Sequence, residues 1–73
     1  MPGVYVYYGQ YTDNMRHGYG LIKYNNMQVY IGVWAYDCYH GYGKLMNAEG
    51  WVVEQGVYRN SEIIKSAFFS ELA

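Results

Sequence analysis

The chain has 73 residues, of which 52% are apolar and 15% are charged, and its formal net charge is −1. A chain of this length forms one domain with a small core, because it can bury only about 60% of the surface that the unfolded chain exposes. The near-neutral charge argues against a nucleic-acid-binding protein, and the single cysteine, Cys38, excludes an internal disulfide and suits a reducing compartment.

No segment reaches the roughly 18 consecutive apolar residues of a membrane-spanning helix. Residues 1–8 also lack the basic start and the aliphatic run of a secretory signal. We therefore expect a cytoplasmic protein. The basic residues do not recur at equivalent positions, so no repeated basic stripe for nucleic acid or anionic lipid is predicted. These residues are Arg16, Lys23, Lys44, Arg59 and Lys65.

Alternation of apolar and polar residues, with many β-branched and aromatic side chains, predicts antiparallel strands along most of the chain. In chain order, strands are expected at residues 4–11, 17–24, 29–34, 40–46 and 51–58. Asp, Asn and Gly favour turns because they tolerate left-handed backbone and bond their own main chain. Turns are expected at residues 12–15, 25–26, 36–39 and 47–50.

The same pattern occurs twice, 23 residues apart. Tyr7-x-Gly9-x-Tyr11 is followed by His17-Gly18-Tyr19-Gly20, and Tyr30-x-Gly32-x-Trp34 is followed by His40-Gly41-Tyr42-Gly43. Repeats are therefore predicted at residues 7–29 and 30–52. A partial repeat at 54–58 begins with Glu54 in place of tyrosine and has no His-Gly-x-Gly after it. A period of this length indicates an array whose units bury their apolar faces on their neighbours.

Glycine weakens a strand, so a glycine that recurs inside strands needs a reason. We predict that an aromatic ring of an adjacent strand lies over the bare backbone, where a Cβ would interfere. The glycines expected to have this structural role are Gly9, Gly18, Gly20, Gly32, Gly41 and Gly43. His17 and His40 are expected to cap turns with their rings rather than to act in catalysis.

Tyr-x-Gly-x-Trp/Tyr followed six residues later by His-Gly-x-Gly resembles the MORN (membrane occupation and recognition nexus) repeat. The resemblance covers 7–29, 30–52 and half a unit at 54–58. It implies an all-β fold, an elongated single-layer antiparallel sheet of stacked β-hairpins over residues 1–60. It also implies a role in holding other proteins, as in axonemal, cytoskeletal and junctional assemblies.

The tail departs from the repeat. Ile64, Phe68 and Leu72 are spaced as on one face of a helix, and Ser61 can cap its start. We expect a short amphipathic helix over residues 61–73 that caps the array. A third return strand at residues 62–65 is the alternative.

Sites of chemistry are not predicted. One cysteine and two histidines do not supply the four ligands of a structural zinc. Neither Gly18-x-Gly20 nor Gly41-x-Gly43 has the spacing of a phosphate-binding loop. We therefore expect no enzyme activity, no metal and no cofactor.

The sequence instead predicts a protein-interaction or structural module of a larger assembly, with a cytoskeletal or ciliary setting implied by the resemblance alone. The expected partners are proteins of that assembly, other MORN chains among them, and neither nucleic acid nor a membrane. The alternatives are a phospholipid-surface adaptor and an accessory subunit of an enzyme complex. Aromatic anchors dominate interface energetics. The expected partner contacts are Tyr5, Tyr7, Tyr30, Trp34, Tyr42, Trp51, Phe68 and Phe69.

Overall fold

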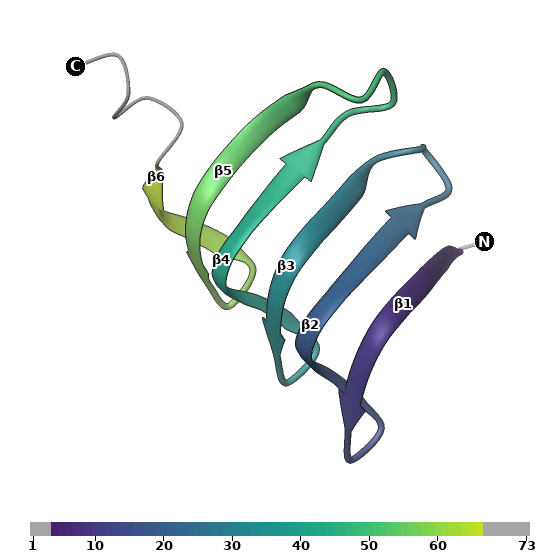
Figure 1. Cartoon of the computed structure of the whole chain (residues 1–73), viewed down its shortest axis with the longest axis vertical. Helices are drawn as coiled ribbons and strands as arrows, with labels where there is room; N and C mark the ends of the chain where they lie inside the picture. Colours follow the sequence, from purple (N-terminus) through teal and green to yellow (C-terminus); the bar gives the residue numbers. More distant parts are fainter. Residues whose placement is uncertain (1–3, 67–73) are drawn as a thin grey trace.

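The computed structural model describes residues 4–66, and these form one open sheet of six antiparallel strands. Each strand pairs with the next one in the sequence, so the sheet is a row of three hairpins without any crossover (Figure 1). This confirms the predicted all-β, single-layer antiparallel fold. The strands are β1 (Tyr5–Thr12), β2 (Met15–Tyr24), β3 (Val29–Ala35), β4 (Cys38–Met46), β5 (Val52–Arg59) and β6 (Glu62–Ser66).

The three hairpins close through the same kind of two-residue turn. Both central residues have positive φ in each turn: 51° and 64° at Asp13 and Asn14, 50° and 67° at Tyr36 and Asp37, and 51° and 67° at Asn60 and Ser61. Two successive left-handed residues define the type I′ turn, whose twist matches that of the flanking strands. The turns predicted at residues 12–15 and 36–39 are thus confirmed.

The third hairpin is complete, which corrects the sequence-based prediction for the tail. Glu62–Ser66 form β6 instead of the start of a helix, so the alternative reading of a return strand is right for this segment. This segment forms a strand because its backbone pairs with the edge of β5, which would otherwise be open, and because Ile63 packs against the core. The remainder of the predicted helix, residues 67–73, lies outside the described residues.

A row of glycines crosses the sheet. Gly9 pairs with Gly20, Gly20 with Gly32, Gly32 with Gly43, and Gly43 with Gly56. The register of β1 to β5 therefore places one glycine of each of these strands at the same level of the sheet.

Tyrosine rings occupy the space that side chains would need at two of these glycines. A Cβ at Gly20 would overlap the ring and hydroxyl of Tyr7, and a Cβ at Gly43 would overlap those of Tyr30. The predicted close approach of a ring to bare backbone is therefore confirmed at these positions. Each hydroxyl also donates a hydrogen bond to the backbone carbonyl three residues on, at 2.8 Å for Tyr7 and 2.9 Å for Tyr30.

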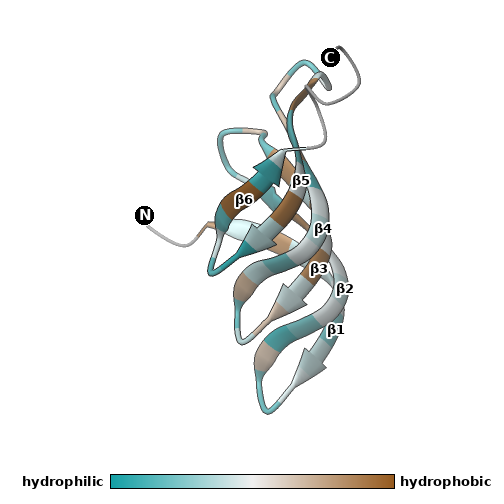
Figure 2. Ribbon diagram, turned by 90° about the vertical axis from the view of Figure 1, so that its left-hand side faces the viewer, coloured by the Kyte–Doolittle hydropathy of each residue, from teal (hydrophilic) through white to brown (hydrophobic). Residues whose placement is uncertain are grey.

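The strands bend at the glycine row. Side chains four residues apart on a straight strand would be about 13 Å apart, but the rings of Tyr30 and Trp34 have centroids 5.2 Å apart and those of Tyr7 and Tyr11 are 5.0 Å apart. Gly32, between the first pair, has φ 157°, which favours glycine. The side of the sheet on the inside of this bend is called the core face below, and the curvature is visible in Figure 2.

The third hairpin replaces both partners of the ring–glycine contact. Glu54 stands where Tyr7 and Tyr30 stand in the other hairpins, and its carboxylate accepts a hydrogen bond of 2.9 Å from the Tyr58 hydroxyl. Ser66 pairs with Gly56 and so occupies the glycine row on β6. A residue with a Cβ is therefore found where no tyrosine ring fills the space.

The core is small and mostly aromatic. Its buried members are Ile22, Tyr30, Trp34 and Tyr58. Tyr30 and Tyr39 stack with centroids 3.8 Å apart and ring planes 5° apart, while Trp34 and Tyr58 meet Tyr30 edge-on. Such contacts add about 0.5–1.5 kcal/mol per pair beyond burial itself. Burial raises the pKa of the Tyr30 phenol to about 12, and it also raises the pKa values of Tyr39 and Tyr58.

Consecutive hairpins are joined at their turns by a recurring backbone contact. The Asp37 amide donates to the Arg16 carbonyl at 3.0 Å, and the Arg16 amide donates to the Asp37 carboxylate at 2.8 Å. One hairpin further on, the Ser61 amide donates to the Tyr39 carbonyl at 3.1 Å and the Tyr39 amide donates to the Ser61 hydroxyl at 3.2 Å. The Arg16 guanidinium adds an ion pair of 2.9 Å to Asp37. Together, the backbone amide and guanidinium of Arg16 lower the pKa of the Asp37 carboxyl.

We expect Gly43→Ala to reduce the free energy of unfolding by about 2–3 kcal/mol, because its Cβ would displace the buried Tyr30 ring. Gly50→Ala is the matched control. No atom lies within 4 Å of its Cβ, so only its φ of 90° opposes alanine and the cost should be about 1 kcal/mol. Urea unfolding of both variants measures the difference. Equal losses would show that ring contact does not select glycine in this row.

Alkaline pH should weaken the fold. The folded pKa of Tyr30 is raised from 10.0 to about 12, so an unfolded chain releases this proton at lower pH than the folded one does. The contribution is complete below pH 10.0 and is lost as pH rises from there towards 12. Urea midpoints measured across this window should fall together with the appearance of phenolate absorbance. A constant midpoint up to about pH 12 would contradict this assignment.

Candidate functional site

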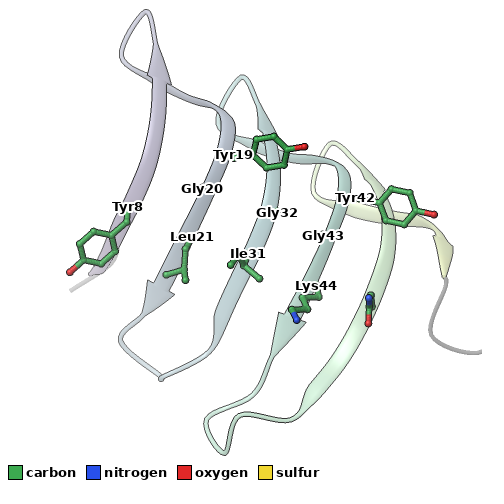
Figure 3. A pocket seen from close by; sticks show the side chains of 10 residues that line it. Tyr8, Tyr19, Gly20, Leu21, Ile31, Gly32, Tyr42, Gly43 and Lys44 are labelled. Carbon is green, nitrogen blue, oxygen red and sulfur yellow. The ribbon is translucent and has the colours of Figure 1, made fainter.

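The side opposite the core face is called the open face, and a row of exposed or half-buried side chains crosses it. Cross-strand pairing links Tyr8 to Leu21, Leu21 to Ile31, Ile31 to Lys44, and Lys44 to Gln55. Because directly paired residues lie on the same side of a sheet, one side chain from each of five strands stands in this line. Figure 3 shows the row from Tyr8 to Lys44.

Two tyrosines stand on the other side of the glycine row. Tyr19 and Tyr42 are 72% and 65% exposed, and the backbone of Gly20, Gly32 and Gly43 lies between them and the first row (Figure 3). The two rows and this backbone line a shallow depression of about 620 Å³. Its length runs across the strands, along the direction in which the hairpins follow one another.

The depression offers flat aromatic area together with polar tips. Tyrosine supplies large contact area at low entropic cost, since only two side-chain torsions are fixed on binding, and its hydroxyl can donate or accept a hydrogen bond. Leu21 and the exposed Ile31 add an aliphatic strip between Tyr8 and Lys44. These side chains can bind a ligand that carries both apolar groups and polar backbone, but they include no nucleophile oriented by a base.

Three lysines form a diagonal on the open face. Lys23 pairs with Val29, Lys44 pairs with Ile31 and Gln55, and Lys65 pairs with Val57. Each lysine is therefore two strands and two residues from the next, about 12 Å away. Among residues 4–66 none of the three takes part in an ion pair, so their charges face solvent.

Most acidic residues of the described part of the chain lie elsewhere. Asp13 and Asp37 occupy turns at the end of the sheet, Glu49 lies in the connection before β5, and Glu54 faces the core. Glu62 adjoins the core residue Ile63 and so lies on the open-face side, where it pairs with Arg59 across the turn. The open face is therefore positive although the whole chain is not. Sequence comparison at a spacing of 23 residues missed this diagonal, because the sheet brings together lysines that are 21 residues apart.

The structure separates the predicted partner contacts into two groups. Tyr30 and Trp34 are 0% and 2% exposed, so as core residues they do not offer a contact surface, and Tyr7 is half-buried over Gly20. This corrects the prediction for Tyr30 and Trp34: their size and polar tips suit a buried cluster as well as an interface. The Trp34 indole N–H donates to the Gly20 carbonyl at 3.2 Å.

The remaining predicted contacts are exposed or undescribed. Tyr42 lies on the open face, Trp51 precedes β5 and is 71% exposed, and Tyr5 lies under the Arg16 guanidinium at the β1 edge. Phe68 and Phe69 lie outside the described residues. Tyr8, Tyr19, Leu21 and Ile31 were not predicted; the available signal was their alternation with the framework residues, which places them on the opposite face.

The other predicted framework residues have distinct local roles. Gly18 and Gly41 have φ of 93° and 78°, a left-handed backbone that glycine adopts readily. The His17 ring lies edge-on to Tyr36 of the next hairpin at 5.1 Å, and its Nδ1 accepts a long 3.4 Å contact from the Tyr36 amide. His40 is exposed, and its ring has no hydrogen bond within residues 4–66. The turn contact predicted for both histidines is therefore seen at His17.

In the part of the chain that the structure describes, no three His, Cys, Asp or Glu side chains come together as metal ligands. Cys38 is half-buried with a free thiol. Residues 4–66 also contain no helix of the length and apolarity needed to cross a membrane.

Two comparisons with known proteins complete the description of the site. No protein-family model matches the chain, and a search of curated proteins found no similar sequence.

Proposed function

We propose that this chain is a non-catalytic protein-interaction module built from MORN-type hairpins, which binds a partner through its open face. The observation that carries the proposal is the depression between Tyr8, Tyr19 and Tyr42, whose rings are 65–72% exposed and outside the aromatic core. The framework tyrosines and glycines of the repeat already have structural tasks on the core face. The exposed tyrosines are therefore the aromatic anchors available to a partner.

The charge and shape of the open face define the chemistry of that partner. The depression is long, shallow and lined by aromatic and aliphatic side chains together with Lys44. The lysine diagonal continues from Lys44 to Lys23 and Lys65 on the open face outside the depression. An extended protein segment with apolar side chains and several carboxylates is complementary to this surface. Carboxylates about 12 Å apart would meet successive lysines while the apolar residues between them contact the tyrosines.

The wider setting follows from the resemblance described above. A module of this kind would act inside a larger cytoplasmic assembly, and the cytoskeleton or a cilium is the setting that the resemblance favours. An open row of hairpins suits such a task because it presents a continuous surface along its length.

A phospholipid-surface adaptor is the second candidate, because the lysine diagonal would also attract an anionic membrane. Each lysine near such a surface contributes about 1 kcal/mol, and lipid-binding segments usually cluster four to eight basic residues. Three lysines spread over the open face are fewer than that. The protein partner is favoured because it also uses the tyrosine-lined depression.

We expect the double variant Tyr19→Ser/Tyr42→Ser to lose at least about tenfold in affinity for extended acidic peptides selected on the native chain from a displayed library. Lys44→Gln should weaken the same peptides less and reduce the salt dependence of binding. The control is Tyr36→Ser, because Tyr36 is equally exposed at 69% but lies in a turn. Fluorescence anisotropy measures each affinity.

Three outcomes would contradict the proposal. The first is a library that yields no acidic peptide, and the second is equal binding by the double variant. The third is binding to vesicles rich in phosphatidylserine that Lys44→Gln weakens, in the absence of any peptide ligand, which would favour the phospholipid adaptor instead.

A further inference from the structure

Within residues 4–66, the hydrogen bonds that join consecutive hairpins are left unfilled at both ends of the sheet, and the two ends are complementary. We propose that copies of this chain associate head to tail, with β6 of one copy pairing with β1 of the next and continuing the sheet. The inference concerns the strand edges, so it does not depend on what the open face binds.

The first observation is the recurring contact between turns. Asp37 bonds the backbone of Arg16 on the preceding hairpin, and Ser61 bonds the backbone of Tyr39 in the same way. Each turn residue donates its amide to a carbonyl and offers a side-chain oxygen to an amide. This reciprocal pair of hydrogen bonds therefore holds one hairpin to the next at both junctions of the chain.

Asn14 occupies the equivalent place in the first turn. It is the second left-handed residue there, with φ 64° against 67° for both Asp37 and Ser61, and it is exposed, since β1 is the first strand of the described sheet. Its amide oxygen can accept a hydrogen bond as the oxygens of Asp37 and Ser61 do. Within residues 4–66 it makes no such bond.

Ile63 supplies the complementary backbone groups at the other end. Its partner on β5 is Tyr58, one step beyond the pair Arg59 and Glu62 that closes the turn. Hydrogen-bonded and non-bonded pairs alternate in antiparallel strands. Since the pair that closes a two-residue turn is bonded, the amide and carbonyl of Ile63 point outward from β6, as those of Tyr39 point towards Ser61.

Side-chain burial shows the same incompleteness at the β1 end. Tyr11, Trp34 and Tyr58 occupy equivalent places, two residues after the glycine-row position on β1, β3 and β5. Trp34 and Tyr58 are each 2% exposed because the preceding hairpin covers them, whereas Tyr11 is 57% exposed. Ile63, which is equivalent to Arg16 and Tyr39, is the residue that would cover Tyr11 of the next copy, as Arg16 lies over Trp34 at 4.9 Å.

The β1 edge also lacks the features that keep sheet edges apart. Over Tyr5–Thr12 it has no charged residue and no proline, and five of its side chains are exposed aromatic or β-branched residues. A long uncharged edge of this kind favours pairing with another strand. An interface between two different edges does not close on itself unless the rotation between copies allows it, so chains of increasing length are expected rather than one dimer.

The test uses the whole chain. Sedimentation velocity from about 1 to 500 μM should show a weight-average mass that rises steadily with concentration, without a plateau at the dimer. Directionality is tested in a Cys38→Ser background by mixing a protein that carries Asn14→Cys with one that carries Ile63→Cys. Mild oxidation should cross-link the two different proteins, and neither protein alone should cross-link to itself.

Two matched pairs of variants distinguish specific assembly from nonspecific association. Asn14→Gly keeps the left-handed turn but removes the side-chain acceptor, and it should weaken association about five- to tenfold, while Asp13→Gly in the same turn should not. Tyr11→Lys should weaken association more than Tyr8→Lys, because both residues are exposed on β1 but only Tyr11 lies on the core face. Circular dichroism confirms that each variant is folded.

The proposal is overturned if the folded chain stays monomeric throughout the concentration range. It is also overturned if Asn14→Cys cross-links only to itself, which would show symmetric pairing of two β1 edges. Equal effects of Tyr11→Lys and Tyr8→Lys would show association through exposed aromatic surface without the predicted register.

Discussion

The packing of a tyrosine ring against a glycine on the neighbouring strand is the contact on which the rest of this structure depends. Tyr7 fills the space over Gly20, and Tyr30 fills the space over Gly43. Both rings can lie there because the glycines lack a Cβ, and in the same glycine row Gly32 has a φ of 157° that favours glycine. The bend brings rings four residues apart into contact, and of these Tyr30 and Trp34 are buried in the core of a sheet that has only one layer.

A single-layer sheet has two unlike faces, and this determines where function can reside. The core face is committed to stability, since Tyr30, Trp34 and Tyr58 are buried there. The open face carries Tyr8, Tyr19 and Tyr42 around bare glycine backbone, with lysines across it. The same glycine row thus supports a packed core on one side and a shallow binding surface on the other. The strand edges are a third region, where we propose that β6 of one copy pairs with β1 of the next.

Much of the fold could be predicted from the sequence because its signals are local. The alternation, the Asp13 and Tyr36 turns and the glycine with its covering ring are each specified within about 25 residues. β6 was only the alternative prediction, because Ile64, Phe68 and Leu72 have helical spacing and pairing with the β5 edge is a tertiary effect. Contact residues were assigned by aromatic character, which does not distinguish the buried Trp34 from the exposed Tyr19. The lysine diagonal depends on strand register, and this becomes visible only when the sheet is assembled.

The most direct test of this account is a nuclear Overhauser measurement on the folded chain. If the Tyr30 ring lies over the bare backbone of β4, its ring protons should show strong cross-peaks to the α-protons of Gly43, and Tyr7 should show the same to Gly20. Tyr8, on the open face, should show no such peak to either glycine. Absence of the Tyr30 and Tyr7 cross-peaks in a folded sheet would contradict the central claim, because the bend, the core and the two faces would then need another cause.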